Sequence, residues 1–548
     1  MIQNNAHCLG RAVICSILIF NGIAACLADE SSLRAALSRL LNDKPASSLG
    51  ITGRRMAPAE ISAALAEQYR VRDWQPIWVS SKGPGAGAAI VRKTLKSAAE
   101  EGLRSEDYRV EMIEALWDLN SDTFLAKLEV LLSIELAAYL ADVKGGRTDP
   151  RKLDPDLFAS ARDVQVNPVE LALAAIDAKD LAKFIASQPP NHVHYRRLKK
   201  ALVDYREIAA QGEWEPIADG ETLKPGMRSD RILLIRDRLK RTGDLSPESV
   251  ASPRYDQEFE QAVKQFQSRF HLNVDGAIGK NTIAAMNVPL DQLIRRIIIN
   301  MERWRWLSHK LGDKGIFVNI ASFSMQAGHD GIVDIEMPVI VGEQYHKTPV
   351  FSASIKYLEF NPYWNIPDSI ATDEMYPALL KDPEHLKKQN IRMFEGWAKD
   401  AQEIDPSTID WAEIGQRGIM KYRLRQDPGP KNSLGRIKFM FPNRFDVYLH
   451  DTPAHHLFSR ARRDFSHGCI RVSRPFDLAS YLLGGAEKGW DEERMKKILE
   501  RKIPTRVRLK KPFPIHILYR TASVDADGLV YFAEDIYDRD RMLEQALY

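Results

Sequence analysis

The chain has 548 residues, of which 44% are hydrophobic and 28% are charged, and its formal net charge is only +3. A length of this size predicts about three folded domains, each able to bury a core. The balanced charge, with no basic stripe interleaved with aromatic residues, argues against a nucleic-acid partner.

The first 28 residues have the pattern of an export signal. Arg11 precedes an apolar run, AVICSILIFNGIAACLA, that ends in small residues before Asp29. This pattern predicts a signal peptide over residues 1–28, cleaved after Ala28, and an exported protein. Two alternatives stay open: a lipidated Cys26, which ends the lipoprotein-like stretch IAAC, and an uncleaved membrane anchor.

Residues 29–220 show helical patterns and carry no chemistry that we can assign. The most apolar stretch, at 124–143, is interrupted by Lys127, Glu129 and Glu135. Buried charges of this kind are costly in a bilayer, so the stretch predicts an amphipathic or core helix rather than a membrane span.

Residues 221–292 predict a small helical module. Apolar residues recur near the 3.6-residue period in two segments, DRILLIRDRLKRTG and YDQEFEQAVKQFQSRF. A turn at Asp275 and Gly276 then precedes a third, short helix.

A strand is expected at 444–453, RFDVYLHDTP. Phe445, Val447 and Leu449 alternate with polar residues, which is the two-residue period of a strand. This alternation places Tyr448 and His450 on one side of the strand.

Cys469 is the only one of the four cysteines that lies outside the first thirty residues. An unpaired thiol in an exported protein is either an inert buried residue or a nucleophile. It follows Gly468 in a tight turn before a short strand or helix, and a further helix pattern begins at Pro475 and stops at Gly484.

The neighbours of this cysteine favour catalysis. An imidazole can lower the pKa of a thiol from about 8.5 and form an ion pair with it. We therefore predict His450 as the base and Cys469 as the nucleophile. The N–H groups of His467, Gly468 and Cys469 are the predicted oxyanion donors.

The stretches YLHDTP and SHGCIRV together resemble the active-site signature of L,D-transpeptidases, cysteine enzymes that crosslink bacterial peptidoglycan. The resemblance extends through NPYWNIP at 361–367, LRQDPGPKNSLGRIKFMFPN at 424–443 and LVYFAEDIYDRD near the C-terminus. These stretches are similar to the large, multi-domain periplasmic branch of that family, and they cover most of residues 293–548.

The resemblance implies a multi-domain α+β architecture. It comprises a helical scaffold domain (29–220), a three-helix peptidoglycan-binding module (221–292) and a β-rich catalytic domain (293–548), with a helical lid inserted at 367–415. The module resemblance rests on core and turn positions: Phe266, Gln267, Leu272, Asp275, Gly276, Gly279 and Thr282.

The implied reaction makes crosslinks between the third residues of two stem peptides through a Cys469 thioester. Arg471 is expected to bind a substrate carboxylate, Tyr448 to bind substrate or pack under the lid, and Ser466 to bind substrate, orient His450 or brace the turn. A backbone carbonyl is the expected partner that orients His450. Peptidoglycan stem peptides and carbapenems are the expected ligands, other cell-wall synthesis proteins are possible partners, and no cofactor or metal is expected.

Two alternatives are kept open. His450, His455, His456, His467 and Cys469 could form the zinc site of an exported amidase or carboxypeptidase, because imidazole and thiolate are good zinc ligands. The chain could also be a non-catalytic wall-binding protein. The sequence leaves open whether the acceptor is a stem amine or a lipoprotein amine, and whether hydrolysis or D-amino-acid exchange competes.

Overall fold

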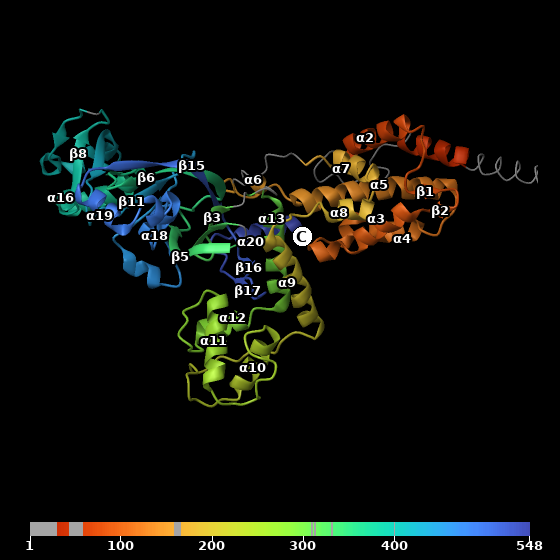
Figure 1. Ribbon diagram of the computed structural model, residues 1–548, viewed down its shortest axis with the longest axis horizontal. Helices are drawn as coiled ribbons and strands as arrows, with labels where there is room; N and C mark the ends of the chain where they lie inside the picture. Colours follow the sequence, from red (N-terminus) through yellow and green to blue (C-terminus); the bar gives the residue numbers. More distant parts are fainter. Residues whose placement is uncertain are drawn as a thin grey trace, which may run out of the picture.

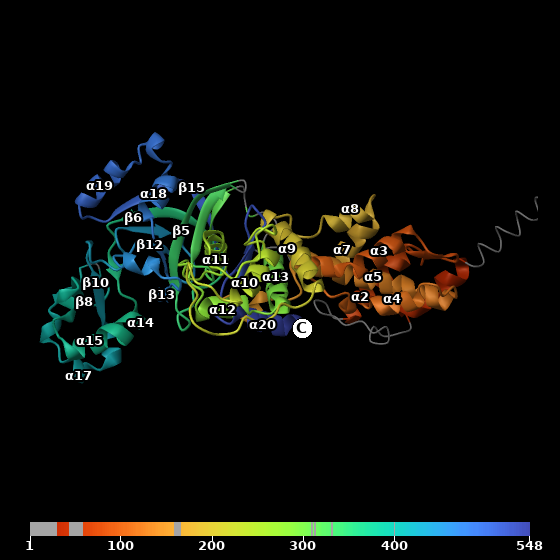
Figure 2. The ribbon, with the colours of Figure 1, turned by 90° about the horizontal axis from the view of Figure 1, so that it is seen from below.

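The computed structural model describes residues 30–42, 58–157, 166–307, 311, 314–329, 332–398 and 400–548. A helical body and a β-rich body lie at opposite ends of an elongated molecule, and a small helical module projects between them (Figures 1 and 2). Residues 1–28, with the predicted signal and Cys26, lie outside the described residues. Among the described helices, none is both long enough and apolar enough to span a bilayer.

The helical body is built around α5 (Asp122–Gly145), whose residues are nearly all buried. Glu129, fully buried, accepts hydrogen bonds from the Tyr69 hydroxyl (2.7 Å) and from the backbone N–H of Trp78 (2.8 Å). The stretch at 124–143 is therefore a core helix. Around it lie a helix over 30–42, α2 (Pro58–Val71), β1 (Val79–Ser80), β2 (Gly83–Pro84), α3 (Ala86–Lys96), α4 (Val110–Leu116), α7 (Pro168–Ile176) and α8 (Leu181–Ala186). The short helix α6 (Pro150–Leu153) packs instead against the core of the β-rich body.

Two long helices join the bodies: α9 (Val193–Ala210) and α13 (Leu290–Arg305). They share a core with a C-terminal hairpin, β16 (Ala522–Val524) and β17 (Val530–Phe532). The predicted boundary between 292 and 293 falls inside α13. One continuous apolar face on each helix lets α9 and α13 form this shared core.

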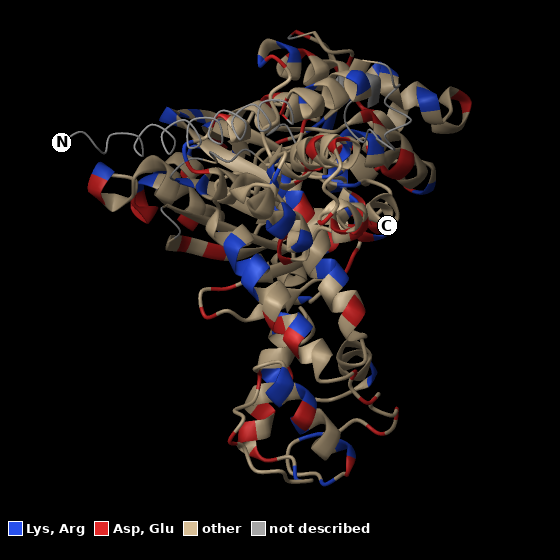
Figure 3. Cartoon of the chain, turned by 90° about the vertical axis from the view of Figure 1, so that its right-hand side faces the viewer, with Lys and Arg blue, Asp and Glu red and all other residues tan. Residues whose placement is uncertain are grey.

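The module contains α10 (Arg231–Arg241), α11 (Gln257–Arg269) and α12 (Lys280–Met286) around one core. Gln267 is 1% exposed, donates to Asp275 Oδ1 (3.0 Å) and accepts from the Gly276 N–H (2.9 Å). Gly276 has φ of +71°, which favours glycine. The three-helix prediction is confirmed, and the motif residues form the core and the turn. Blue basic and red acidic segments alternate along this module in Figure 3.

The β-rich body is a nine-stranded sheet in the order β13-β5-β14-β12-β11-β6-β15-β3-β4, and an additional β4–β5 pairing closes it on itself. Buried side chains fill its interior. The strands are β3 (Lys314–Asn319), β4 (Ser324–His329), β5 (Ile332–Gly342), β6 (Phe351–Phe360), β11 (Ile437–Met440), β12 (Leu449–His450), β13 (Asp464–Ser466), β14 (Ile470–Val472) and β15 (Thr505–Leu518). Helices α18 (Pro475–Leu483), α19 (Glu492–Glu500) and α20 (Arg539–Leu547) complete the body.

The insertion predicted as a helical lid at 367–415 is a larger α+β unit. It has its own core and a four-stranded sheet, β7-β10-β8-β9, so a purely helical lid was wrong. Short apolar alternation such as IRMFE builds these strands. Its elements are β7 (Trp364–Asn365), α14 (Asp368–Ile370), a π-helical turn (Ala371–Met375), α15 (Tyr376–Lys381), α16 (His385–Lys388), β8 (Ile391–Glu395), β9 (Glu403–Ile404), α17 (Trp411–Ile414) and β10 (Tyr422–Gln426).

Buried ion pairs tie the bodies together. Arg539, at the start of α20, donates to Asp154 Oδ2 at 2.8 Å, and both side chains are almost inaccessible. Arg269 of the module pairs with Asp244 and also donates to the Val530 carbonyl of the C-terminal hairpin.

We expect Asp154→Ala to lower the free energy of unfolding by about 3–5 kcal/mol, because Arg539 would keep a buried charge without its carboxylate. Urea unfolding followed by tryptophan fluorescence measures this. The exposed Asp368→Ala is the matched control. A loss below about 1 kcal/mol for Asp154→Ala would contradict the assigned role of the pair.

Candidate active site

The site is set by the parallel pairing of β12 with β14. Leu449 lies opposite Ile470, and His450 lies opposite Arg471. Leu449 and Ile470 are fully buried in the core of the sheet. Because side chains alternate along a strand, His450 and Arg471 project to the other face. Two residues before His450 and Arg471, just ahead of β12 and β14, Tyr448 and Cys469 share that face, which we call the active face.

The adjacent strand β11 adds Lys438 to the active face. Lys438 pairs with His450 in the register, and its Nζ lies 3.7 Å from the centroid of the Tyr448 ring. The Tyr448 and His450 rings meet edge to face at 5.7 Å. The sequence analysis did not single out Lys438. Lys438 lies between the apolar residues Ile437 and Phe439, and this alternation is a strand pattern from which its position on the opposite face of the strand could have been predicted.

The turn that carries Cys469 runs between β13 and β14. Gly468 has φ of +102°, a conformation that a residue with a Cβ adopts only under strain. Thr348 fixes the turn from outside, since its hydroxyl donates to the Gly468 carbonyl at 2.9 Å. Helix α18 then begins at Pro475 and ends at Gly484 in the left-handed conformation, as the sequence predicted.

Ser466 braces this turn, which is one of the roles expected from the sequence. Its side chain is buried, its hydroxyl donates to the Cys469 carbonyl, and it accepts from the Gly468 N–H at 3.3 Å. The substrate contact of Ser466 stays a prediction. The Gly468 N–H points into this bond, so it is a poor oxyanion donor. The N–H groups of His467 and Cys469 find no backbone acceptor among the described residues.

A backbone carbonyl orients His450, as expected. His450 Nδ1 lies 2.6 Å from the Asp451 carbonyl oxygen, which only accepts, so Nδ1 carries the proton and Nε2 is the basic nitrogen. The Asp451 carboxylate is used elsewhere: it accepts the backbone N–H groups of Thr452 (2.7 Å) and Arg436 (2.8 Å). Asp451 therefore contributes its backbone to the site, while its side chain holds the following turn.

Burial acts against the charged forms of both His450 and Cys469. It lowers the pKa of His450 to about 3, and the nearby charge of Arg471 adds to this. Burial also raises the pKa of the Cys469 thiol, although hydrogen bonds from Tyr448 and the charges of Lys438 and Arg471 oppose the rise. Desolvation thus favours a neutral pair over the expected ion pair.

The strand predicted over 444–453 is shorter than expected. Only Leu449–His450 forms β12, and Asp446 adopts φ of +53°. The Asn443 side chain explains the break, because it accepts the Phe445 N–H (2.9 Å) and donates to the Val447 carbonyl (2.7 Å) in a turn. This turn brings the Asp446 carbonyl to 3.8 Å from the Cys469 sulfur.

Arg471 is half-buried, and its Nε has no hydrogen-bond partner among the described residues. Burial lowers its pKa from the usual high value. Its position is compatible with the predicted binding of a substrate carboxylate. Burial raises the pKa of Tyr448, so its hydroxyl stays protonated and can donate toward the sulfur.

The insertion reaches the nucleophile turn. Glu374, in the π-helical turn, lies 2.9 Å from His467 Nε2, and the His467 ring lies 4.7 Å from the His346 ring. Ligand atoms of Glu343, His346 and His467 lie within 4.8 Å of one another, close enough to share an ion. The histidines and the cysteine considered from the sequence as a zinc site do not make up this cluster. Only His467 belongs to the cluster, and His455 instead lies 3.7 Å from Asp451.

Three segments match known family models. Residues 313–498 match the L,D-transpeptidase catalytic domain, and residues 63–202 match a "Scaffold domain". The active face lies within the first match. The chain carries an L,D-transpeptidase catalytic domain. Residues 228–286 match a domain described as "Putative peptidoglycan binding domain", which overlaps the three-helix module.

A Haemophilus influenzae protein named "Putative L,D-transpeptidase" is 34% identical over 254 residues, which are 46% of this chain and 50% of that protein. The chain thus spans about half the length of this relative. Two solved L,D-transpeptidase structures are also similar to parts of this chain. One, from Stackebrandtia nassauensis, is 14% identical over 56% of this chain and 97% of its own, at a TM-score of 0.21. The other, from Xylanimonas cellulosilytica, is 15% identical over 56% and 100%, at 0.18. Scores this low carry no argument about this chain.

The neutral resting site predicts the pH dependence of Cys469 alkylation by iodoacetamide. With the pKa of His450 near 3, no step should appear near pH 6.5, and the rate should rise only above the ordinary thiol value of about 8.5. Lys438→Met should move this rise to higher pH, because it removes a cation that favours thiolate. The exposed Lys356→Met serves as control. A step near pH 6.5 would indicate an ion pair instead.

The contact between Glu374 and His467 predicts that Glu374→Ala loosens the insertion. We expect amide exchange of residues 368–381 to become about 1.5- to 5-fold faster, in line with the energy of a partly exposed ion pair. Mass spectrometry of exchanged peptides measures this. Glu413→Ala, exposed in the same insertion, should leave the rate unchanged, and equal effects of the two variants would contradict the contact.

Proposed function

We propose that the protein is an L,D-transpeptidase that forms crosslinks between the third residues of peptidoglycan stem peptides through a Cys469 thioester. The observation that carries this proposal is the active face itself. It combines a thiol, a buried imidazole whose Nδ1–H is fixed, and two cations on the strands that flank β12. The family match of residues 313–498 supports the same chemistry.

Acylation begins when Nε2 of His450 takes the thiol proton and the sulfur attacks the carbonyl carbon of the third stem residue. The N–H groups of His467 and Cys469 are the available donors to the resulting oxyanion. The intermediate collapses by breaking its C–N bond. The imidazolium gives its proton to the leaving nitrogen, so terminal D-alanine departs as a free amine and the acyl group stays on sulfur.

In the second half of the reaction, the acyl group leaves the sulfur of Cys469 and His450 again handles the proton. The side-chain amine of another stem attacks the thioester carbon, and Nε2 of His450 accepts a proton from the attacking nitrogen. The C–S bond then breaks, and the proton returns to Cys469. A new amide bond joins the two third residues.

The cations of the active face suit a donor with free carboxylates. Arg471 presents an unpartnered Nε, and Lys438 holds its ammonium over the Tyr448 ring. A guanidinium binds a carboxylate with two parallel hydrogen bonds. The insertion, which contacts His467 through Glu374, would limit water at the thioester and so favour the amine.

The proposal also includes the cellular location of the protein and the acceptor of the acyl group. Export to the periplasm fits a peptidoglycan substrate, with a cleaved, lipidated or anchored N-terminus as before. A lipoprotein amine could replace the stem amine as acceptor, and carbapenems are expected to acylate Cys469. A metal-dependent amidase remains the second enzymatic alternative, and activity retained in a strong chelator would remove it.

Intact-mass spectrometry with a disaccharide tetrapeptide tests the proposal. The wild type should gain the mass of the donor minus alanine and release a crosslinked dimer. Cys469→Ala should form neither, and His450→Ala should slow acylation by about 10²- to 10⁴-fold. His455→Ala is the matched histidine control and should behave as wild type. Folded wild-type protein that forms neither adduct nor dimer would favour the non-catalytic alternative.

A further inference from the structure

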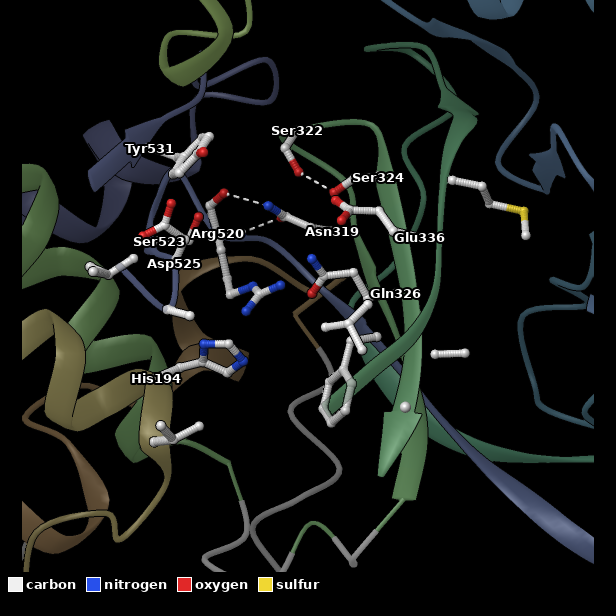
Figure 4. Close-up of a pocket in the computed structure, with 18 of the residues that line it drawn as sticks. His194, Asn319, Ser322, Ser324, Gln326, Glu336, Arg520, Ser523, Asp525 and Tyr531 are labelled. Carbon is white, nitrogen blue, oxygen red and sulfur yellow. Dashed lines mark hydrogen bonds between the residues drawn. The ribbon is translucent and has the colours of Figure 1, made fainter. Parts of the chain in front are cut away.

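A second polar cleft lies away from the active face. It has a volume of about 940 Å³ and opens between α9, the C-terminal end of α11 in the module, strands β3 to β5 and the β16–β17 hairpin (Figure 4). None of its lining residues in the described part of the chain belongs to the active face. Its size is in the range of small-ligand sites.

Arg520 projects its guanidinium into this cleft (Figure 4). It is only 9% exposed, and its backbone is fixed by two hydrogen bonds with the Asn319 side chain, at 2.9 and 3.0 Å. Its Nε has no hydrogen-bond partner, and no carboxylate pairs with it among the described residues. Burial lowers its pKa to about 10, so it remains charged at neutral pH.

Arg238 of the module is also buried without a carboxylate among the described residues, but its guanidinium lies 3.9 Å from the centroid of the Trp214 ring. Other buried arginines do have a carboxylate partner. Arg269, Arg303 and Arg539 are each paired with an aspartate. A buried cation without a counter-charge is costly, so a structure that keeps one has a reason to do so. A ligand that brings its own negative charge would supply the missing partner.

The remaining charges of the cleft are mainly positive. Arg197, Lys314 and Arg463 join Arg520, against two carboxylates, Glu336 and Asp525. Glu336 is exposed, and Asp525 Oδ1 is already bound to the backbone N–H groups of the turn at 527–529. The cleft therefore keeps an excess of positive charge at the position of Arg520.

Neutral polar groups fill the rest of the wall. Burial lowers the pKa values of His192 and His271 to about 4, so both are uncharged at neutral pH. Ser324, Gln326 and Tyr531 add amide and hydroxyl groups, as Figure 4 shows. The chemistry suits a ligand that combines carboxylates with amides or hydroxyls.

We propose that this cleft is a non-catalytic subsite for the carboxylates of a peptidoglycan stem peptide, held between the module and the catalytic body. The inference rests on the proposed function, because it assumes the same polymer as substrate. A strand that places one stem here would present a neighbouring stem to the active face at high effective concentration.

Binding of a disaccharide tetrapeptide to the full chain with Cys469→Ala tests this. Calorimetry gives Kd, and amide exchange gives the location. We expect protection of 192–198 and 519–526, and a Kd at least about tenfold weaker with Arg197→Glu or Arg520→Gln. Arg197 is only partly buried, so its variant should fold even if Arg520→Gln does not. Arg196→Glu, exposed on the same helix, is the control and should change Kd less than about twofold.

Three results would overturn the subsite: protection confined to 464–472, equal protection by a fragment with amidated carboxylates, or citrate binding as tightly as the stem. Failure of the proposed function looks different. In that case the wild type forms no acyl adduct and residues 464–472 gain no protection, whatever happens at the cleft.

Discussion

The parallel register of β12 against β14 is the constraint on which the active site depends. It places Leu449 and Ile470 in the core, and so forces His450 and Arg471 to the opposite face. A shift of one residue in β12 would turn His450 into the apolar interior, and the same shift in β14 would turn Arg471 there. The core of the sheet therefore determines which side chains can react.

Burial gives this face its chemical character. The same desolvation that lowers the pKa of His450 to about 3 raises that of Cys469, so neither group is charged at rest. Lys438 and Arg471 act in the other direction on sulfur, since a cation nearby stabilises thiolate. In the proposed reaction, proton transfer and attack on substrate then occur together, and the site avoids holding a reactive thiolate in water.

Shared cores and buried contacts also hold the separate bodies of the molecule together. α9 and α13 share a core with the C-terminal hairpin, and Arg269 links the module to that hairpin. The module, the two long helices and the closed sheet thus lie in one connected assembly (Figure 1).

The sequence by itself predicted Cys469 as the nucleophile and His450 as the base. It also determined the helix that follows Cys469 and the three-helix module, because short local patterns encode them. It also indicated that a backbone carbonyl orients His450. Only the tertiary structure decided that Lys438 joins the site, that Ser466 braces the turn, that the insertion contains a sheet and that Arg520 lacks a counter-charge. These features depend on strand register and burial between segments far apart in the chain, which periodicity within one segment does not carry.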